Sequence, residues 1–465
     1  MCSLQDDIDI EKKSKPQLKT CVKCKVERAQ YLVRHAQYCK QCFLHTLVGK
    51  FRVMISKSKF VVGRKECKPN VLLAFSGGAS SRALVHMMNE FHVGDPAVKK
   101  KTILDNVKIC HIDESIICGP EEGTLKQAEN IISQYPFQFI GASLEDVFSS
   151  EYTDSDFEQV LRTEIVTREE GSKSHDQLKA VIESSTLTNK EKANALLNNI
   201  VKATAKEDMI SYLKNKLLIQ IAKRENCSII LLGDSSTRIA VKCIAYTSKG
   251  RGFSLPYDVA AEIEVEKGVG YLRPLRDCLT KELGIYNYLH KLETVFVPTI
   301  TTGAPIKASI DRLTEEFITS LDRDFPSTVS TVVRTASKLT TSKSSEQNER
   351  CTVCLRPIQN GISEWRERIT VMELPKSDVN SAIAATDENG NGSACTSDGC
   401  CGQGCGSPKE SKFDLLPLLC YSCQINARDT KPTILPPFMA ERAKEAYSRE
   451  SLREQISEFL IDDSE

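Results

Sequence analysis

The stretch that decides the fold of this chain is Val71-Leu-Leu-Ala-Phe-Ser-Gly-Gly-Ala-Ser-Ser81. Its apolar run predicts a buried strand, its paired glycines predict a tight turn, and Leu84, Met87, Met88 and Phe91 follow at helical spacing. Such a turn can hold a phosphate, because glycines let backbone amides approach the anion and a helix N-terminus supplies free N–H groups. The predicted phosphate contacts are Ser76, Gly77, Gly78, Ser80 and Ser81.

Around this loop, short apolar runs alternate with helical patterns, which is typical of an α/β domain with a doubly wound parallel sheet. Further strands are predicted at 107–112, 137–140 and 228–232. We assign residues 69–325 to this domain and interpret the polar, helix-like stretch at about 150–205 as a surface insertion. The loop is not a Walker A motif, since no Lys-Ser or Lys-Thr pair follows a longer glycine loop.

The chain has 19 cysteines, and its acidic beginning, MCSLQDDIDIEKK, lacks the apolar segment of a secretory signal. This beginning indicates the cytosol or the nucleus, and in such a reducing compartment paired cysteines are metal ligands more often than disulfides. The clearest set has the spacing C-x2-C-x14-C-x2-C and predicts a zinc ribbon in the basic segment 1–68. Its ligands would be Cys21, Cys24, Cys39 and Cys42.

A second set of cysteines lies in the last quarter of the chain, after a Ser/Thr-rich segment, 326–350, that we interpret as a linker. Residues 351–435 are predicted to form a cysteine module with a disordered insert at 376–412, and 436–465 a C-terminal helix. Metal ligands are again predicted, although the long gap makes the spacing less specific. They are Cys351, Cys354, Cys420 and Cys423.

The net charge of the whole chain is zero, but residues 1–70 hold 16 lysines and arginines against 6 aspartates and glutamates. A basic region of this kind suits RNA, because phosphate neutralisation releases counterions, and it equally suits a solvated surface. A second basic site is the glycine-flanked Lys249-Gly-Arg-Gly-Phe253. The predicted RNA contacts are Lys57, Lys59, Arg64, Lys65 and Arg251.

Residues 76–81 resemble the SGGxDS pyrophosphate loop of ATP pyrophosphatases that adenylate their substrates, including tRNA thiolases. Residues 111–116 look like the second-strand element of the tRNA 2-thiolation subgroup, which adds Asp113 to the nucleotide site. Together with a cysteine-pair module at each end, the chain resembles the cytoplasmic tRNA 2-thiolation protein 2 family. The resemblance implies an ATP-pyrophosphatase type of fold.

The chain also departs from the catalytic members of this superfamily. Ser80 takes the acidic position of the loop, Ala79 the position that often holds lysine, and Thr237 and Arg238 replace paired carboxylates. Carboxylates are the ligands expected for Mg²⁺, so these replacements predict a degenerate site without catalytic residues. The isolated Cys227, Cys243 and Cys278 are expected to be buried structural thiols.

The resemblance implies a subunit of the cytosolic complex that 2-thiolates the wobble uridine of tRNA(Lys), tRNA(Glu) and tRNA(Gln). The chain would form a heterodimer with a catalytic homologue, which would bind ATP and Mg²⁺ and take sulfur from a thiocarboxylated ubiquitin-like carrier. Zinc would be structural in this chain, and tRNA would be a partner.

Two alternatives remain open at this point. One is an adenylating sulfurtransferase active in its own right, with Mg²⁺ near Asp113, Glu114 or Asp234. The other is a zinc-bearing RNA-binding scaffold outside thiolation. We expect a cytoplasmic protein without a membrane partner, because no stretch of 18 or more apolar residues is present.

Overall fold

The computed structural model describes residues 20–62, 68–93, 103–118, 124–149, 187–295, 297–340, 349–369, 416–428 and some positions between 430 and 449. Arg64, Lys65, the predicted insert at 376–412 and most of the predicted C-terminal helix lie outside the described residues.

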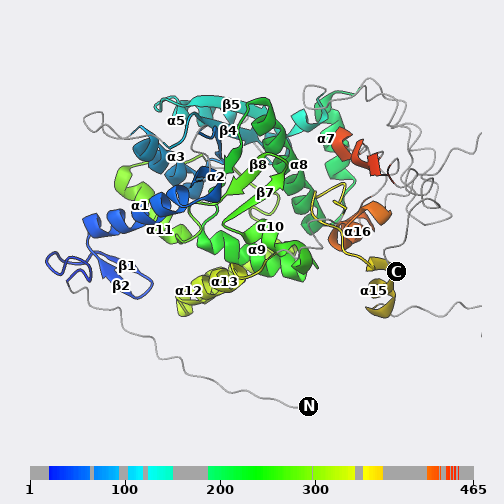
Figure 1. Ribbon diagram of the computed structural model, residues 1–465. Coiled ribbons are helices and arrows are strands. Elements are labelled where there is room, and N and C mark those ends of the chain that lie inside the picture. Colours follow the sequence, from blue (N-terminus) through cyan, green and yellow to red (C-terminus); the bar gives the residue numbers. More distant parts are fainter. Residues whose placement is uncertain are drawn as a thin grey trace, which may run out of the picture.

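A six-stranded sheet forms the centre of the molecule (Figure 1), in the order β5-β4-β3-β6-β8-β7. Five strands are parallel, and only the edge strand β7 runs antiparallel, to β8. The predicted α/β class with a mostly parallel sheet is therefore confirmed. The strands are β3 (Val71–Ala74), β4 (Val107–Asp113), β5 (Gln138–Ser143), β6 (Ile229–Leu231), β7 (Glu262–Glu266) and β8 (Val269–Leu272).

The strand order locates the crevice in which such sheets bind ligands. From β3 the chain first winds through β4 to β5 and then crosses over to β6 on the other side of β3. Ligands of open α/β sheets bind at such a reversal, beyond the carboxyl ends of the strands. The glycine turn after β3 and the loop after β6 therefore lie side by side at this point.

One face of the sheet is covered by helices from the N-terminal half and by one later helix. Val71 and Leu73 point to this face, whereas Leu72 points to the other, as the two-residue period of a strand requires. Residues Phe43, Leu47, Phe51 and Ile55 of the first helix belong to this core, so the N-terminal module is anchored to the domain. The helices on this face are α1 (Lys40–Ser56), α3 (Ala79–His92), α5 (Leu125–Ile132) and α11 (Thr280–His290).

The opposite face packs against residues that the sequence analysis assigned elsewhere. Leu196 and Leu197 are buried, which corrects the expectation of a surface insertion for the described part of 150–205. Leu418, Leu419 and Phe438 join the same core, so the C-terminal cysteine module is fused with the α/β domain. The helices here are α7 (Asn189–Asn198), α8 (Ala203–Arg224) and α16 (Tyr421–Arg428), and α15 (Ile362–Ile369) packs against α16.

A smaller cluster of helices lies beside the sheet and contains most of the segment expected to be a linker. Val329, Val333 and Ala336 of that segment are buried at helical spacing against the helix that follows β6. The Ser/Thr-rich composition led to the prediction of a linker, but the segment forms a helix whose polar residues face outward and whose apolar residues face inward. This layer consists of α9 (Ser236–Ser248), α10 (Leu255–Val259), α12 (Ile310–Asp324) and α13 (Thr328–Ala336).

Short elements complete the fold. A hairpin of β1 and β2 precedes α1 and projects from the body of the molecule (Figure 1), beside the helices of the first face. The short elements are β1 (Tyr31–Val33), β2 (Ala36–Tyr38), α2 (Lys59–Val62), α4 (Ser115–Cys118), η1 (Leu144–Phe148), η4 (Gly252–Ser254), η5 (Ile306–Ala308) and η6 (Leu416–Leu418). No helix among the described residues is both long and apolar enough to cross a membrane.

Candidate functional site

The glycine turn has the backbone shape that the sequence predicts. Gly77 has a φ of +79°, a backbone conformation that residues with an L side chain rarely adopt. Gly78 is the N-cap of α3, which begins at Ala79. The serine hydroxyls, however, bond within the turn: Ser76 Oγ donates to Ser81 Oγ at 3.2 Å, and Ser81 Oγ lies 3.0 Å from the carbonyl oxygen of Gly78. Ser81 is buried, whereas Ser80 is half-buried.

The segment that follows α11 closes over this turn. Val295 donates its N–H to the carbonyl oxygen of Gly77 at 3.0 Å, and a Cβ at Gly77 would lie only 2.8 Å from the Cβ of Val295. Arg82 donates to the carbonyl oxygen of Glu293, and Asn287 to that of Ala79, each through its side chain. An apolar side chain thus lies against the glycine that an anion would have to approach.

The loop after β6 packs directly on the start of α3. A Cβ at Gly233 would lie 3.1 Å from both the Cα and the backbone nitrogen of Ser81, so a side chain here would require the start of α3 to shift by a few tenths of an ångström. The next residue, Asp234, accepts two hydrogen bonds from Lys242 Nζ, at 2.8 and 2.9 Å, and one from Arg273 Nε at 3.1 Å. Burial opposes ionisation of Asp234, but these two cations hold its pKa well below its usual range. Asp234 is therefore a carboxylate already neutralised by protein cations.

The residues that replace the paired carboxylates are engaged as well. Thr237 Oγ1 accepts the N–H of Thr280 at 3.2 Å. Arg238 lies 3.7 Å from Glu315 in an exposed ion pair.

The acidic residues after β4 also have protein partners. Asp113 Oδ1 accepts hydrogen bonds from the N–H and hydroxyl of both Ser115 and Thr124. Burial raises the pKa of Asp113, but these bonds lower it more, and the result is a lowered pKa. Glu114 pairs with Lys214 at 3.0 Å. His111 lies behind them, bonded to Phe75 and to Thr124 Oγ1, each at 2.8 Å.

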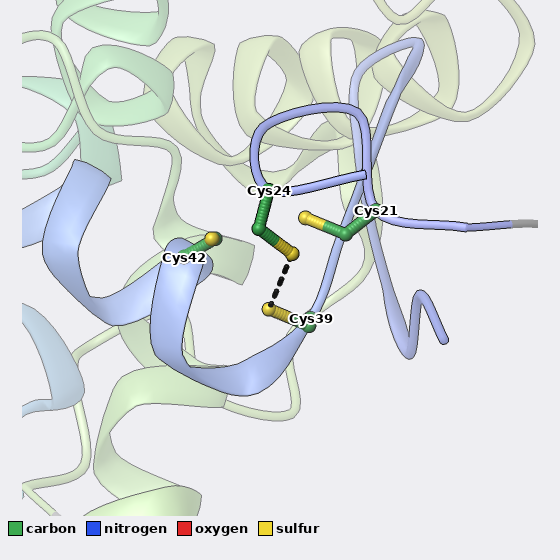
Figure 2. A group of neighbouring side chains, drawn as sticks. All are labelled: Cys21, Cys24, Cys39 and Cys42. Carbon is green, nitrogen blue, oxygen red and sulfur yellow. Dashed lines mark hydrogen bonds between the residues drawn. The ribbon is translucent and has the colours of Figure 1, made fainter. Parts of the chain in front are cut away.

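The structure brings the four N-terminal cysteines together (Figure 2), with their Sγ atoms all within 4.8 Å of one another. Cys21 and Cys24 form a tight turn in which the next residue, Lys25, has a φ of +57° and donates its N–H to the carbonyl oxygen of Cys21. Cys39 is the N-cap of α1 and Cys42 lies in its first turn. His45 bonds to Lys23 and is not part of the cluster.

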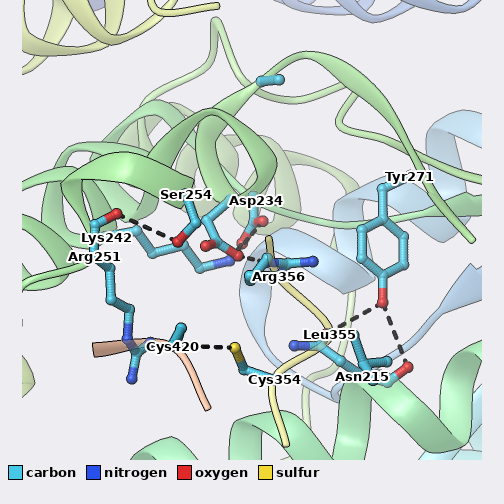
Figure 3. A network of polar contacts seen from close by, with 12 residues as sticks. Asn215, Asp234, Lys242, Arg251, Ser254, Tyr271, Cys354, Leu355, Arg356 and Cys420 are labelled. Carbon is cyan, nitrogen blue, oxygen red and sulfur yellow. Dashed lines mark hydrogen bonds and ion pairs between the residues drawn. The ribbon is translucent and has the colours of Figure 1, made fainter. Parts of the chain in front are cut away.

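The C-terminal cysteines form a second cluster with the same backbone plan. Figure 3 shows two of them, Cys354 and Cys420, beside Arg251 and Arg356. Leu355, directly after Cys354, has a φ of +63° and donates its N–H to the carbonyl oxygen of Cys351. Cys420 directly precedes α16 and Cys423 lies in its first turn. Each cluster therefore joins a tight turn to a helix N-terminus, where free N–H groups favour thiolates.

Both clusters can hold a metal ion and contain no disulfide. The distance from Cys24 Sγ to Cys39 Sγ is 3.9 Å, and that from Cys354 Sγ to Cys420 Sγ is 3.6 Å. A disulfide would need about 2.05 Å between its sulfur atoms. All the cysteines whose side chains the structure describes are free, and the thiols of Cys227 and Cys278 are buried as expected, with Cys243 half-buried.

The basic residues predicted to touch RNA have different environments. Lys57 and Lys59 are exposed at the end of α1 and the start of α2. Arg251 is buried, in an ion pair with Asp208 and with its guanidinium over the rings of Tyr212 and Tyr246. The prediction of an RNA contact at Arg251 is corrected, because its charge is directed into the protein beneath the second cysteine cluster. The glycine before it, Gly250, makes room for the ring of Tyr421.

Sequence reasoning did not find the residues that close the site. Val295, Lys242 and Arg273 come from segments without a recognisable motif, and their importance follows only from their contacts with Gly77 and Asp234.

Fold and site define the class: an α/β protein with a phosphate-type loop at the switch point of its sheet, a cysteine cluster in an N-terminal hairpin module and a second one in the core of one face. The family model described as cytoplasmic tRNA 2-thiolation protein 2 matches residues 309–425, which include all four C-terminal cysteines. The chain is 30% identical to cytoplasmic tRNA 2-thiolation protein 2 of Xenopus tropicalis, covering 96% of this chain and 95% of that one. It is 29% identical to the protein of the same name in Danio rerio, with the same coverage. The chain belongs to the cytoplasmic tRNA 2-thiolation protein 2 family.

Among solved structures, the chain is similar to the U34-tRNA thiolase NcsA of Methanococcus maripaludis, described with its [4Fe-4S] cluster. The TM-score is 0.47 at 15% identity, covering 69% of this chain and 87% of that one. A likeness of this size carries no argument about chemistry.

Proposed function

We propose that this chain acts in cytoplasmic tRNA 2-thiolation as a subunit that does not itself activate the tRNA. The role in tRNA 2-thiolation follows from family membership, and, as in the names of its relatives, the place of action is the cytoplasm. The observation that supports a non-catalytic role is the contact between Val295 and Gly77. It packs the Cβ of Val295 against the Cα of Gly77, so the glycine turn is closed on that side by the protein itself.

The charges around the loop support the same proposal. Adenylation with ATP needs oxygen ligands for Mg²⁺ close to the phosphates. Asp234 is held by two protein cations, Glu114 by Lys214, and Asp113 by Ser115 and Thr124. In the rival model, in which this chain is an active enzyme, a metal ion would have to compete with protein cations at Asp234 and at Glu114.

In the proposed complex, a catalytic homologue forms a heterodimer with this chain and binds ATP and Mg²⁺. It adenylates the wobble uridine of tRNA(Lys), tRNA(Glu) and tRNA(Gln), and sulfur from a thiocarboxylated ubiquitin-like carrier displaces AMP. This chain contributes a tRNA-binding surface. The exposed Lys57 and Lys59, next to the N-terminal cysteine module, are its proposed phosphate contacts, because phosphate contacts position an RNA without reading its sequence.

We propose zinc as the metal of both cysteine clusters. Four thiolates at about 2.3 Å from a zinc ion form a tetrahedron whose sulfur atoms are about 3.8 Å apart. The distances of 3.9 and 3.6 Å agree with this geometry. An iron–sulfur cubane binds each thiolate to a different iron and therefore needs the sulfur atoms farther apart. Metal analysis of the purified chain, with two zinc ions per chain expected and iron absent, tests this assignment.

The function is tested by reconstituting thiolation with ATP, Mg²⁺ and a sulfur donor, read by the retardation of tRNA in mercury-containing gels. Three reactions are compared: this chain alone, the catalytic homologue alone, and both together. We expect retarded tRNA only with both chains, and no change when Ser76→Ala and Ser81→Ala are combined in this chain. Thiolation by this chain alone would overturn the non-catalytic assignment.

A further inference from the structure

A third group of metal-ligating side chains lies outside both cysteine clusters, between the two helices that bracket the glycine turn. It comprises His86 and Glu90 on α3 and His290 on α11. One donor atom from each residue lies within 4.8 Å of the others. His86 and Glu90 are four residues apart, so both project from the same side of α3.

The hydrogen bonds of this group leave a nitrogen of His86 available. The hydroxyl of Tyr286 donates to Glu90 Oε2 at 3.5 Å and lies 2.8 Å from Nδ1 of His86. In the tautomer in which Nδ1 of His86 donates the shorter bond, the hydroxyl proton is directed to Glu90 and Nε2 keeps an unshared pair. Metal-binding histidines are usually oriented in this way, by a hydrogen bond from the ring nitrogen that does not bind the metal.

The surroundings favour the neutral rings that metal binding requires. Burial lowers the pKa of both His86 and His290, and Glu90 only partly offsets this effect. The rings themselves are close, with centroids 4.7 Å apart. All three residues are half-buried, so an ion can reach them from solvent without unfolding the helices.

We propose that His86, Glu90 and His290 form a binding site for a first-row divalent ion such as Zn²⁺, which fastens α11 to α3. Two imidazoles and one carboxylate are a donor set that zinc accepts, with a fourth position left for water, whereas Mg²⁺ and Ca²⁺ prefer oxygen ligands. Since α11 leads into the segment that holds Val295 on Gly77, the ion would stabilise the closed glycine turn. The inference does not depend on whether the chain is catalytic.

The test uses the full chain as purified, with its cysteine clusters filled, and Co²⁺ as the added probe. Wild type is expected to bind one further Co²⁺, giving weak d–d bands without the strong thiolate-to-cobalt charge-transfer bands of a cysteine site. The double variant His86→Asn with His290→Asn is expected to bind none. His92→Asn, a change on the same helix outside the group, should bind as wild type does.

Glu90→Gln keeps both histidine rings and therefore still tests the site if the double variant does not fold. Circular dichroism checks that each variant is folded. We expect Glu90→Gln to bind Co²⁺ roughly tenfold or more weakly than wild type. Zn²⁺ should displace the cobalt and raise the melting temperature of wild type but not of the double variant. An additional Co²⁺ bound equally by wild type and by a folded double variant, or one with thiolate charge-transfer bands, would overturn the proposal.

Discussion

The two cysteine clusters share one backbone plan but lie in different surroundings. In both, a residue with positive φ follows a CxxC turn, and the second pair sits at a helix N-terminus. The N-terminal cluster fastens a projecting hairpin, with Cys24 and Cys42 half-exposed. In the C-terminal cluster only Cys354 is half-exposed, and the cysteines belong to the same core as the central sheet. The same arrangement of four cysteines therefore holds a local appendage in one place and completes the core of a domain in another.

The largest loss of stability should come from substitutions in the C-terminal cysteine cluster. We expect Cys420→Ser combined with Cys423→Ser to prevent folding, because the lost metal site supports a core that covers one face of the sheet. The cost would approach the whole stability of a typical domain, about 5–15 kcal/mol. Soluble yield and thermal melting followed by circular dichroism measure it. A soluble variant that melts like wild type would show that this cluster is no more structural than the N-terminal one.

A smaller loss of stability should follow when the buried ion pair beneath that cluster is removed and the cysteines are kept. Arg251→Ala removes one of the two buried cations that pair with Asp208, and Lys249 remains, so we expect a smaller loss of stability than the about 3–5 kcal/mol of a buried charge left wholly unpaired. Urea denaturation measures the loss. The matched control is Arg238→Ala, which removes an exposed ion pair and should cost less than about 1 kcal/mol. Equal losses in the two variants would contradict the placement of Arg251 in the interior.

On the face of the sheet that carries α1 and α3, the packing of Val295 against the glycine turn can be tested by substitution. Gly77→Ala and Gly268→Ala introduce the same left-handed strain, about 1–2 kcal/mol each, since both glycines have φ near +80°. Only Gly77 also meets Val295, whereas a Cβ at Gly268 would meet nothing within 4 Å. We therefore expect Gly77→Ala to lose more free energy of unfolding, and Val295→Gly, which removes the contacting Cβ, to restore part of the difference. Equal losses of unfolding free energy for Gly77→Ala and Gly268→Ala would mean that the segment around Val295 moves aside at little cost.

The smallest effect on global stability should come from the N-terminal cysteines. Cys21→Ser with Cys24→Ser is expected to leave the main melting transition almost unchanged, because α1 remains anchored by Phe43 and Phe51. Hydrogen exchange of residues 20–39 should nevertheless rise strongly, since a segment of this kind opens on its own. Loss of the main transition would show that the hairpin and the sheet fold as one unit.

Much of this fold could be predicted from the sequence, because buried parallel strands are continuous apolar runs. The strands at 71–74, 107–113, 138–143 and 229–231 end within a few residues of their predicted limits. The hairpin of β7 and β8 was missed although its signal is present, an alternating Glu-Ile-Glu-Val-Glu before Lys267-Gly268. The gathering of each set of four cysteines also follows the predicted spacing.

The rest depends on contacts between distant segments. The sequence around Gly77 does not predict its contact with Val295, which lies more than two hundred residues later. Arg273 reaches Asp234 only because β8 pairs with β6. The glycines around Arg251 suggested an approach to phosphate, whereas Gly250 makes room for a tyrosine ring. Local sequence gives the shape of a loop, but its neighbours decide what the loop can bind.

The shared core of the sheet and the C-terminal module has a consequence for synthesis on the ribosome. Leu72, in the first strand of the sheet, is buried in one cluster with Leu418, Cys423 and Met439. A growing chain must therefore keep part of this face, beside α7 and α8, uncovered until about its last tenth has emerged, and chaperones would have to shield that part in the interval. A premature stop codon before residue 416 would leave that surface permanently bare, and such a fragment should be removed by proteolysis rather than persist as a partial protein.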